Sequence, residues 1–181
     1  MLENAAVEIL SLAAYPGAPE VVEDGGSFLE NALKKARAFA EFTGEAVLAD
    51  DSGLEVDALA GRPGVYSSRY AGPDANDEEN IKKLLLELRD VPAEKRGAAF
   101  RCTLVMYRPD GEYDTFEGTL RGVITTEPRG TQGFGYDPVF FVPEIGKTAA
   151  EMPMEVKNSI SHRGAAPVSY THLTLPTNRE V

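Results

Sequence analysis

The feature that most constrains the fold is a short apolar run, residues 46–49, which leads directly into two aspartates, a serine and a glycine at positions 50–53. Apolar runs of this length, bounded by turn residues, are typical of buried strands. In open α/β sheets the ligand crevice lies at the carboxyl ends of strands. Adjacent carboxylates repel one another unless a cation lies beside them. The stretch therefore indicates a Mg²⁺ site with a carboxylate that acts as a base, although an ordinary acidic turn has the same residue types.

The composition excludes several classes of protein. A chain of 181 residues forms one domain and buries a core without disulfides, and its single cysteine, Cys102, is expected to be a buried inert thiol. A net charge of −11 argues against a general nucleic-acid binder. Because the sequence has no apolar run near the roughly 18 residues of a membrane span and no signal peptide, we expect a cytoplasmic protein without a membrane partner.

Apolar spacing predicts two helices. The first covers residues 28–43: Ser27 and Glu30 have the spacing of a capping box, and Gly44 suits its end. The second covers residues 76–90. Because the cap gives Glu30 a structural role, a glutamate in the loop before the helix is the better candidate for a metal ligand.

Strands are predicted between and after these helices. Residues 7–12 are compatible with an edge strand, and residues 139–142 with a buried strand. Residues 97–107 and 113–124 flank a Pro-Asp-Gly turn and predict a hairpin. The alternation of strands and helices indicates an α/β fold.

Two later stretches carry groups that are suited to binding a nucleotide. In a glycine-rich loop, Phe134 and Tyr136 are suited to stacking on a base, although a turn with buried aromatic rings has the same pattern. Lys157, His162 and Arg163 are donors suited to phosphate or carbonyl oxygens. A basic surface turn is the alternative for these three.

Taken together, the stretches resemble the inosine triphosphate pyrophosphatase family, also called dITP/XTP pyrophosphatases. The resemblance runs from Glu23 to Arg163. The stretches that carry it are Ser27-Phe28-Leu29-Glu30-Asn31-Ala32 with Lys35, Leu48-Ala49-Asp50-Asp51-Ser52-Gly53-Leu54-Glu55-Val56, Pro63-Gly64-Val65-Tyr66-Ser67-Ser68-Arg69-Tyr70, Gly133-Phe134-Gly135-Tyr136-Asp137-Pro138 and Lys157-Asn158-Ser159-Ile160-Ser161-His162-Arg163. It implies a long central mixed sheet flanked by helices, and a homodimer that hydrolyses dITP, ITP and XTP to the monophosphate and pyrophosphate.

The resemblance also implies a role for each matching residue. Asp51 is the proton acceptor and a Mg²⁺ ligand, and Glu23 is the second ligand. The implied substrate contacts are Lys35, Ser52, Phe134, Gly135, Tyr136, Asp137, Lys157, His162 and Arg163. Mg²⁺ held by few carboxylates keeps waters, one of which can attack a phosphate. Donors that face the 6-oxo group of hypoxanthine or xanthine would reject adenine.

The chain departs from this family at both ends. The resemblance implies an N-terminal strand with a Ser/Thr-x-Asn-x-x-Lys motif, which the sequence does not show, and residues 168–177 resemble a translated sequencing adapter. We therefore expect a pyrophosphatase domain over residues 1–167 that lacks this strand, a non-native tail over residues 168–181, and a chain of low stability and weak activity. The alternatives are a nucleotide-binding module without catalysis and a house-cleaning pyrophosphatase for other modified nucleotides.

Overall fold

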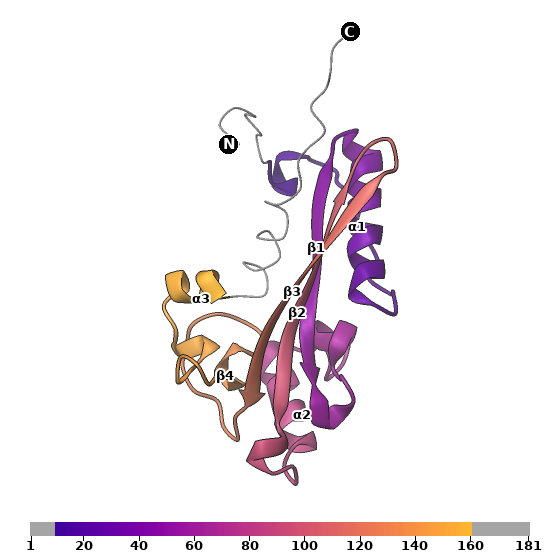
Figure 1. The fold of residues 1–181 in the computed structure, drawn as a ribbon. Helices are drawn as coiled ribbons and strands as arrows, with labels where there is room; N and C mark the ends of the chain where they lie inside the picture. The colour runs from indigo at the N-terminus through magenta and orange to yellow at the C-terminus, as the bar shows by residue number, and fades with distance from the viewer. Residues whose placement is uncertain (1–9, 161–181) are drawn as a thin grey trace.

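The computed structural model describes residues 10–160, and its architecture is a twisted antiparallel sheet with helices packed on both faces (Figure 1). The strands are β1 (Val47–Val56), β2 (Gly97–Tyr107), β3 (Tyr113–Ile124), β4 (Phe140–Val142) and β5 (Lys147–Thr148), in that order across the sheet. The helices are α1 (Phe28–Thr43), α2 (Asp77–Glu87) and α3 (Met154–Ile160). The α/β class is confirmed. Where a mixed sheet was expected, all pairings among the described strands are antiparallel.

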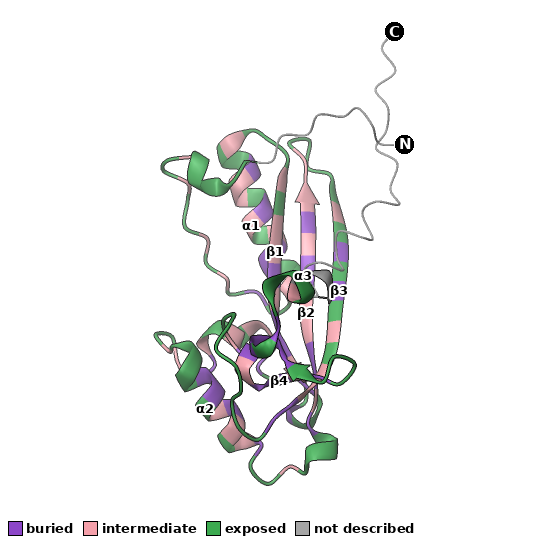
Figure 2. Ribbon diagram, turned by 90° about the vertical axis from the view of Figure 1, so that its left-hand side faces the viewer, coloured by how far each residue is buried: buried purple, intermediate pink, exposed green. Residues whose placement is uncertain are grey.

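The two main helices cover opposite faces of the sheet near its opposite ends (Figure 2). Side chains alternate between the faces of a strand. On one face, Ala32 and Ala36 of α1 pack against Val105 of β2. On the other face, Leu54 of β1 joins a larger core with Leu84 of α2. The middle of β1 is therefore where the covering layer changes from one face to the other.

Helix α1 has the bounds that the sequence predicted. The Ser27 side chain accepts a hydrogen bond from the Glu30 amide at 3.2 Å. Glu30 reaches back to the amide of Gly26 at 2.6 Å, one residue earlier than a capping box predicts. Gly44 ends the helix with φ 73° and donates to Ala40. The helix is thus set by its own sequence.

Four predicted boundaries differ from the structure. Residues 50–53 are not a turn, because β1 continues through them to Val56, paired throughout with β2. Helix α2 ends at Glu87, before the predicted residue 90. In the predicted strand 139–142, Val139 belongs to a 3-10 turn and pairing begins at Phe140. Within the proposed edge strand 7–12, Leu12 starts a 3-10 turn instead.

Some predictions fall outside residues 10–160. They are the start of the proposed edge strand, the contacts of His162 and Arg163, and the non-native origin of residues 168–181. Within the described part of the chain, no helix is long and apolar enough to cross a membrane.

Candidate functional site

The two adjacent aspartates of β1 do not form a pair. Asp50 and Asp51 lie in an extended strand, so their side chains point to opposite faces of the sheet. Asp50 accepts a hydrogen bond from the hydroxyl of Ser52 at 3.0 Å, on the face away from α1. The two neighbouring carboxylates therefore face different surroundings, because the chain is extended where the residue types suggested a turn.

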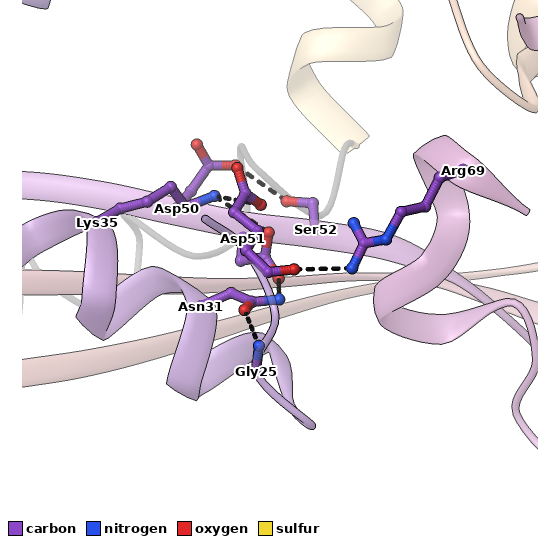
Figure 3. A network of polar contacts seen from close by, with 8 residues as sticks. Gly25, Asn31, Lys35, Asp50, Asp51, Ser52 and Arg69 are labelled. Carbon is purple, nitrogen blue, oxygen red and sulfur yellow. Dashed lines mark hydrogen bonds and ion pairs between the residues drawn. The ribbon is translucent and has the colours of Figure 1, made fainter. Parts of the chain in front are cut away.

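Asp51 lies beside Asn31 and Lys35 of α1 (Figure 3), and it shares the Lys35 ammonium with a second carboxylate, which comes from the loop before α1. The ammonium nitrogen of Lys35 lies 3.1 Å from Oδ1 of Asp51 and 3.1 Å from Oε2 of Glu23. Asn31 donates to Oδ2 of Asp51 at 3.2 Å. Asp51 is 8% exposed, so its carboxylate is held by protein groups more than by water. Glu23 and Asp51 thus converge on one positive charge.

We call Glu23, Lys35 and Asp51 the acidic cluster. The spacing of residues along α1 and the buried side-chain amide of Asn31 bring the three together. Asn31 and Lys35 are four residues apart on α1, so both face β1. The side-chain oxygen of Asn31 accepts from the amide of Gly25 at 2.8 Å, which holds the loop that carries Glu23.

From the other side of this loop, an arginine binds the backbone. Arg69 donates from Nη2 to the Glu23 carbonyl at 2.7 Å. Asn31 had no predicted role, although its place one turn before Lys35 was a usable pattern.

The electrostatics of the acidic cluster follow from two carboxylates and one ammonium. Burial raises the pKa of Asp51. The Lys35 ammonium opposes this shift, and the hydrogen bond with Glu23 adds to it. The pKa of Asp51 therefore lies above its ordinary value. Burial lowers the pKa of Lys35, but Asp51 and Glu23 together outweigh it, so this pKa is also raised. Because one negative charge is in excess, a further cation would be stabilised here.

A cavity of about 360 Å³ opens on the other face of β1, the face to which Ser52 points. Leu54, Phe100 and Leu120 line it with apolar surface. Its polar lining residues include Ser52, Ser67, Asp77, Asn80, Asp137 and Lys157. A mainly apolar cavity with few polar groups is typical of a site for a flat organic ring.

The predicted loop of residues 133–137 forms one side of this cavity. The ring of Phe134 is 63% exposed, and Nζ of Lys157 lies 4.9 Å from its centroid. Asp137 is buried, accepts from the amide of Phe134 at 3.0 Å and forms an ion pair with Lys157. Gly133 has φ 82°, and a Cβ there would collide with the Asp137 carboxylate. The structure therefore brings Phe134, Asp137 and Lys157 together in one wall of the cavity, and their contacts with a substrate stay predictions.

The acidic cluster and the cavity are connected around the edge of β1 by η3, a 3-10 helix (Gly64–Arg69). Ser67 and Ser68 line the cavity, whereas Arg69 binds the loop of Glu23. The hydroxyl of Tyr136 donates to the Ser67 carbonyl at 2.9 Å. A ligand with a ring in the cavity and a charged tail along this edge would reach both parts of the site.

Comparisons with known proteins identify the family of this chain. Residues 1–170 match the Ham1 family. The chain is 58% identical over 166 residues to a dITP/XTP pyrophosphatase of Geobacter sulfurreducens, covering 92% of this chain and 83% of that protein. It is 55% identical over 152 residues to a dITP/XTP pyrophosphatase of Yersinia pestis, covering 83% of this chain and 77% of that protein.

Solved structures give the same result for the fold. The Ham1 protein of Staphylococcus aureus superposes with a TM-score of 0.84 at 44% identity, covering 90% of this chain and 84% of that one. A nucleoside-triphosphatase / dITP/XTP pyrophosphatase of Mycobacterium abscessus superposes with a TM-score of 0.78 at 45% identity, covering 97% and 87%. On sequence and structure alike, this chain belongs to the Ham1 family.

Proposed function

We propose that this chain hydrolyses dITP, ITP and XTP to the monophosphate and pyrophosphate. The observation that carries the proposal is the high identity, over most of the chain, to relatives named dITP/XTP pyrophosphatases. The geometry supports it, because a cavity suited to a purine lies beside a cluster of carboxylates suited to a phosphate-bound cation.

The cation we propose is Mg²⁺, and the residues present fit it. Glu23 and Asp51 lie at equal distances from one ammonium nitrogen, so a positive charge between them is stable. Among residues 10–160, no group of three or more His, Cys, Asp or Glu side chains gathers as a metal site. Two carboxylates suit Mg²⁺, which keeps several waters and takes oxygens from a substrate. When bound, Mg²⁺ supplies charge neutralisation and a more acidic water.

In this proposal Asp51 takes the proton from the water that attacks the α-phosphate. The bond from Asn31 fixes the direction of the Asp51 carboxylate, and burial keeps competing water away from it. Lys35 provides a positive charge for the phosphates. Ser52 points to the cavity side of the same strand and provides a hydroxyl to the substrate.

The base is expected to lie in the cavity against Phe134. The exposed ring of Phe134 offers a stacking surface, and the neighbouring amides of Gly135 and Tyr136 line the same wall. The buried pair of Asp137 and Lys157 supplies an acceptor and a donor. His162 and Arg163 are kept as substrate contacts on the resemblance alone.

A substrate panel tests the proposal. Purified chain is mixed with Mg²⁺ and dITP, ITP, XTP, dATP, dGTP or dUTP, and the nucleotide and phosphate products are separated by chromatography. We expect monophosphate and pyrophosphate from the first three, and about a thousandfold loss in Asp51→Asn. The matched control is Glu55→Gln, because Glu55 lies on the same face of β1 and is also in an ion pair, with Arg101.

Other outcomes favour the alternatives. Binding without product release would contradict the proposal in favour of a nucleotide-binding module, and preference for dUTP would favour a different house-cleaning enzyme. The homodimer and the cytoplasmic location are also proposals that rest on the resemblance. Sedimentation equilibrium and imaging of the tagged chain test them.

A further inference from the structure

One carboxylate in the wall of the cavity belongs to a helix that the proposed chemistry does not use. Asp77 is the first residue of α2, and its Oδ2 accepts a hydrogen bond from the amide of Gly135 at 2.6 Å. The two residues are 58 positions apart in the chain. Both line the cavity, together with Phe134. The bond therefore ties the loop that presents Phe134 to a separate element.

The loop needs such a tie because its own backbone is permissive. Gly133 and Gly135, on either side of Phe134, have φ values of 82° and 60°. A Cβ on Gly135 would meet nothing within 4 Å, so this side of the residue faces open space. The Phe134 ring itself is mostly exposed. Glycines leave a backbone many conformations, so the direction of the ring depends on the hydrogen bonds that hold the loop: the one from the Phe134 amide to Asp137 within it, and the one from the Gly135 amide to Asp77 outside it.

Helix α2 is a firm support for this bond. Asn76 and Glu79 form a complete capping box at its start, and Ile81 and Leu84 bury its inner face in the main core. An acidic side chain in the first turn is stabilised by the helix dipole. Asp77 therefore offers a charged acceptor from a rigid backbone, and hydrogen bonds to charged acceptors are stronger than neutral ones.

We propose that Asp77 is a positioning residue for base binding, since it holds the amide of Gly135 and thereby keeps the Phe134 ring in place to stack on the base. The inference rests on the proposed function for the identity of the ligand. Asp77 acts through Gly135 and touches neither the α-phosphate nor the acidic cluster. Its loss should therefore weaken nucleotide binding and leave the chemical step intact.

Three variants separate this role from a general loss of structure. Asp77→Ala removes the acceptor, Asp77→Asn keeps an oxygen acceptor, and Glu78→Ala removes the next carboxylate of the same helix turn without touching the loop. We expect Asp77→Ala to raise KM for dITP about tenfold with kcat within twofold of the parent chain. Asp77→Asn should recover most of the affinity, and Glu78→Ala should match the parent chain.

A second readout does not depend on turnover. Amide hydrogen exchange at Gly135, followed by NMR, should be faster in Asp77→Ala than in the parent chain or in Glu78→Ala. Calorimetric binding of inosine monophosphate should weaken in the same variant by a similar factor. If no chain hydrolyses dITP, the proposed function fails, while exchange and monophosphate binding still decide the role of Asp77.

The inference is overturned if Asp77→Ala binds nucleotide as tightly as Glu78→Ala does. It is also overturned if kcat falls while KM stays constant, because a loss in the chemical step alone would place Asp77 outside base binding.

Discussion

The close packing around Gly53 predicts that replacing this glycine lowers the stability of the chain. Gly53 lies in β1, two residues after Asp51, at the point where α1 and η3 both approach the strand. A Cβ at Gly53 would lie 2.5 Å from the Gly64 carbonyl oxygen, 2.7 Å from Oγ of Ser67 and 2.8 Å from Cε1 of Phe28. Glycine is needed here for close approach, because the strand conformation itself is available to any residue.

The cost of Gly53→Ala follows from these contacts. Overpacking of a well-packed region costs about 1–3 kcal/mol. To relieve the clash η3 must move, and Ser67 would then lose the hydrogen bond that it accepts from the Leu54 amide at 2.8 Å, which adds about 1 kcal/mol. We therefore expect the free energy of unfolding to fall by about 2–4 kcal/mol. For a chain of this size Tm should fall by roughly 10 °C.

Urea unfolding followed by circular dichroism, together with a thermal scan, measures both quantities. The matched control is Gly26→Ala, because a Cβ at Gly26 would meet only the tip of Glu30 at 3.6 Å and its φ is not left-handed. This control should stay within about 0.5 kcal/mol of the parent chain. If Gly53→Ala is as stable as Gly26→Ala, then η3 does not pack against β1 as described, and the connection between the two parts of the site is refuted.

Three further predictions concern buried charge and titration. Arg96→Met should lower the free energy of unfolding, measured with urea, by about 3 kcal/mol, because the Arg96 guanidinium donates to three backbone carbonyls and Arg96 is 4% exposed. The control Arg89→Met, at an exposed ion pair, should change this free energy by less than about 0.5 kcal/mol. Lys35→Met should destabilise the chain by about 3 kcal/mol at neutral pH. The Lys35 ammonium lowers the pKa of Asp51, so without it burial raises this pKa further in the variant than in the parent chain. The variant therefore gains more stability from protonation as the pH falls, and its deficit should shrink; a deficit constant with pH would contradict the account. Burial, together with the hydrogen bond to Glu87, raises the pKa of Tyr70 to about 12. The stability that comes from the neutral phenol should therefore be kept below pH 10 and lost between about pH 10 and 12. Tyrosinate absorbance should show one fewer late-titrating group in Tyr70→Phe.

Local sequence was enough for those elements whose boundaries are marked by their own residues. Helix α1 begins after Ser27 and ends before Gly44, because a cap and a left-handed glycine act within one helical turn. The hairpin of β2 and β3 was predicted for the same reason, since its turn residues lie between two runs of strand-forming residues.

The same local reasoning failed at residues 50–53. Aspartate, serine and glycine are common turn residues. The chain nevertheless stays extended, because Asp51 and Ser52 of β1 pair with Thr103 and Cys102 of β2. Strand pairing over many residues outweighs the weak local preferences of a few. That difference matters for the site, because an extended chain sends Asp50 and Asp51 to opposite faces.

For the candidate site, the charged and aromatic residues were named in advance, and the uncharged amide that connects them was not. Lys35, Asp51, Phe134 and Lys157 were named from residue type and resemblance, and their substrate contacts stay predictions. Asn31 has no distinctive chemistry until it is seen between the Gly25 amide and the Asp51 carboxylate.

The sequence by itself determined the family, the first helix, the hairpin and the residues that carry charge, because each of these depends on residue type and on short spacings along the chain. The tertiary structure alone decided that Asn31 links the Gly25 amide to Asp51, and that Asp77 reaches Gly135 in the wall of the cavity. The physical reason is that hydrogen bonds and ion pairs act over about 3 Å in space and are indifferent to distance along the chain.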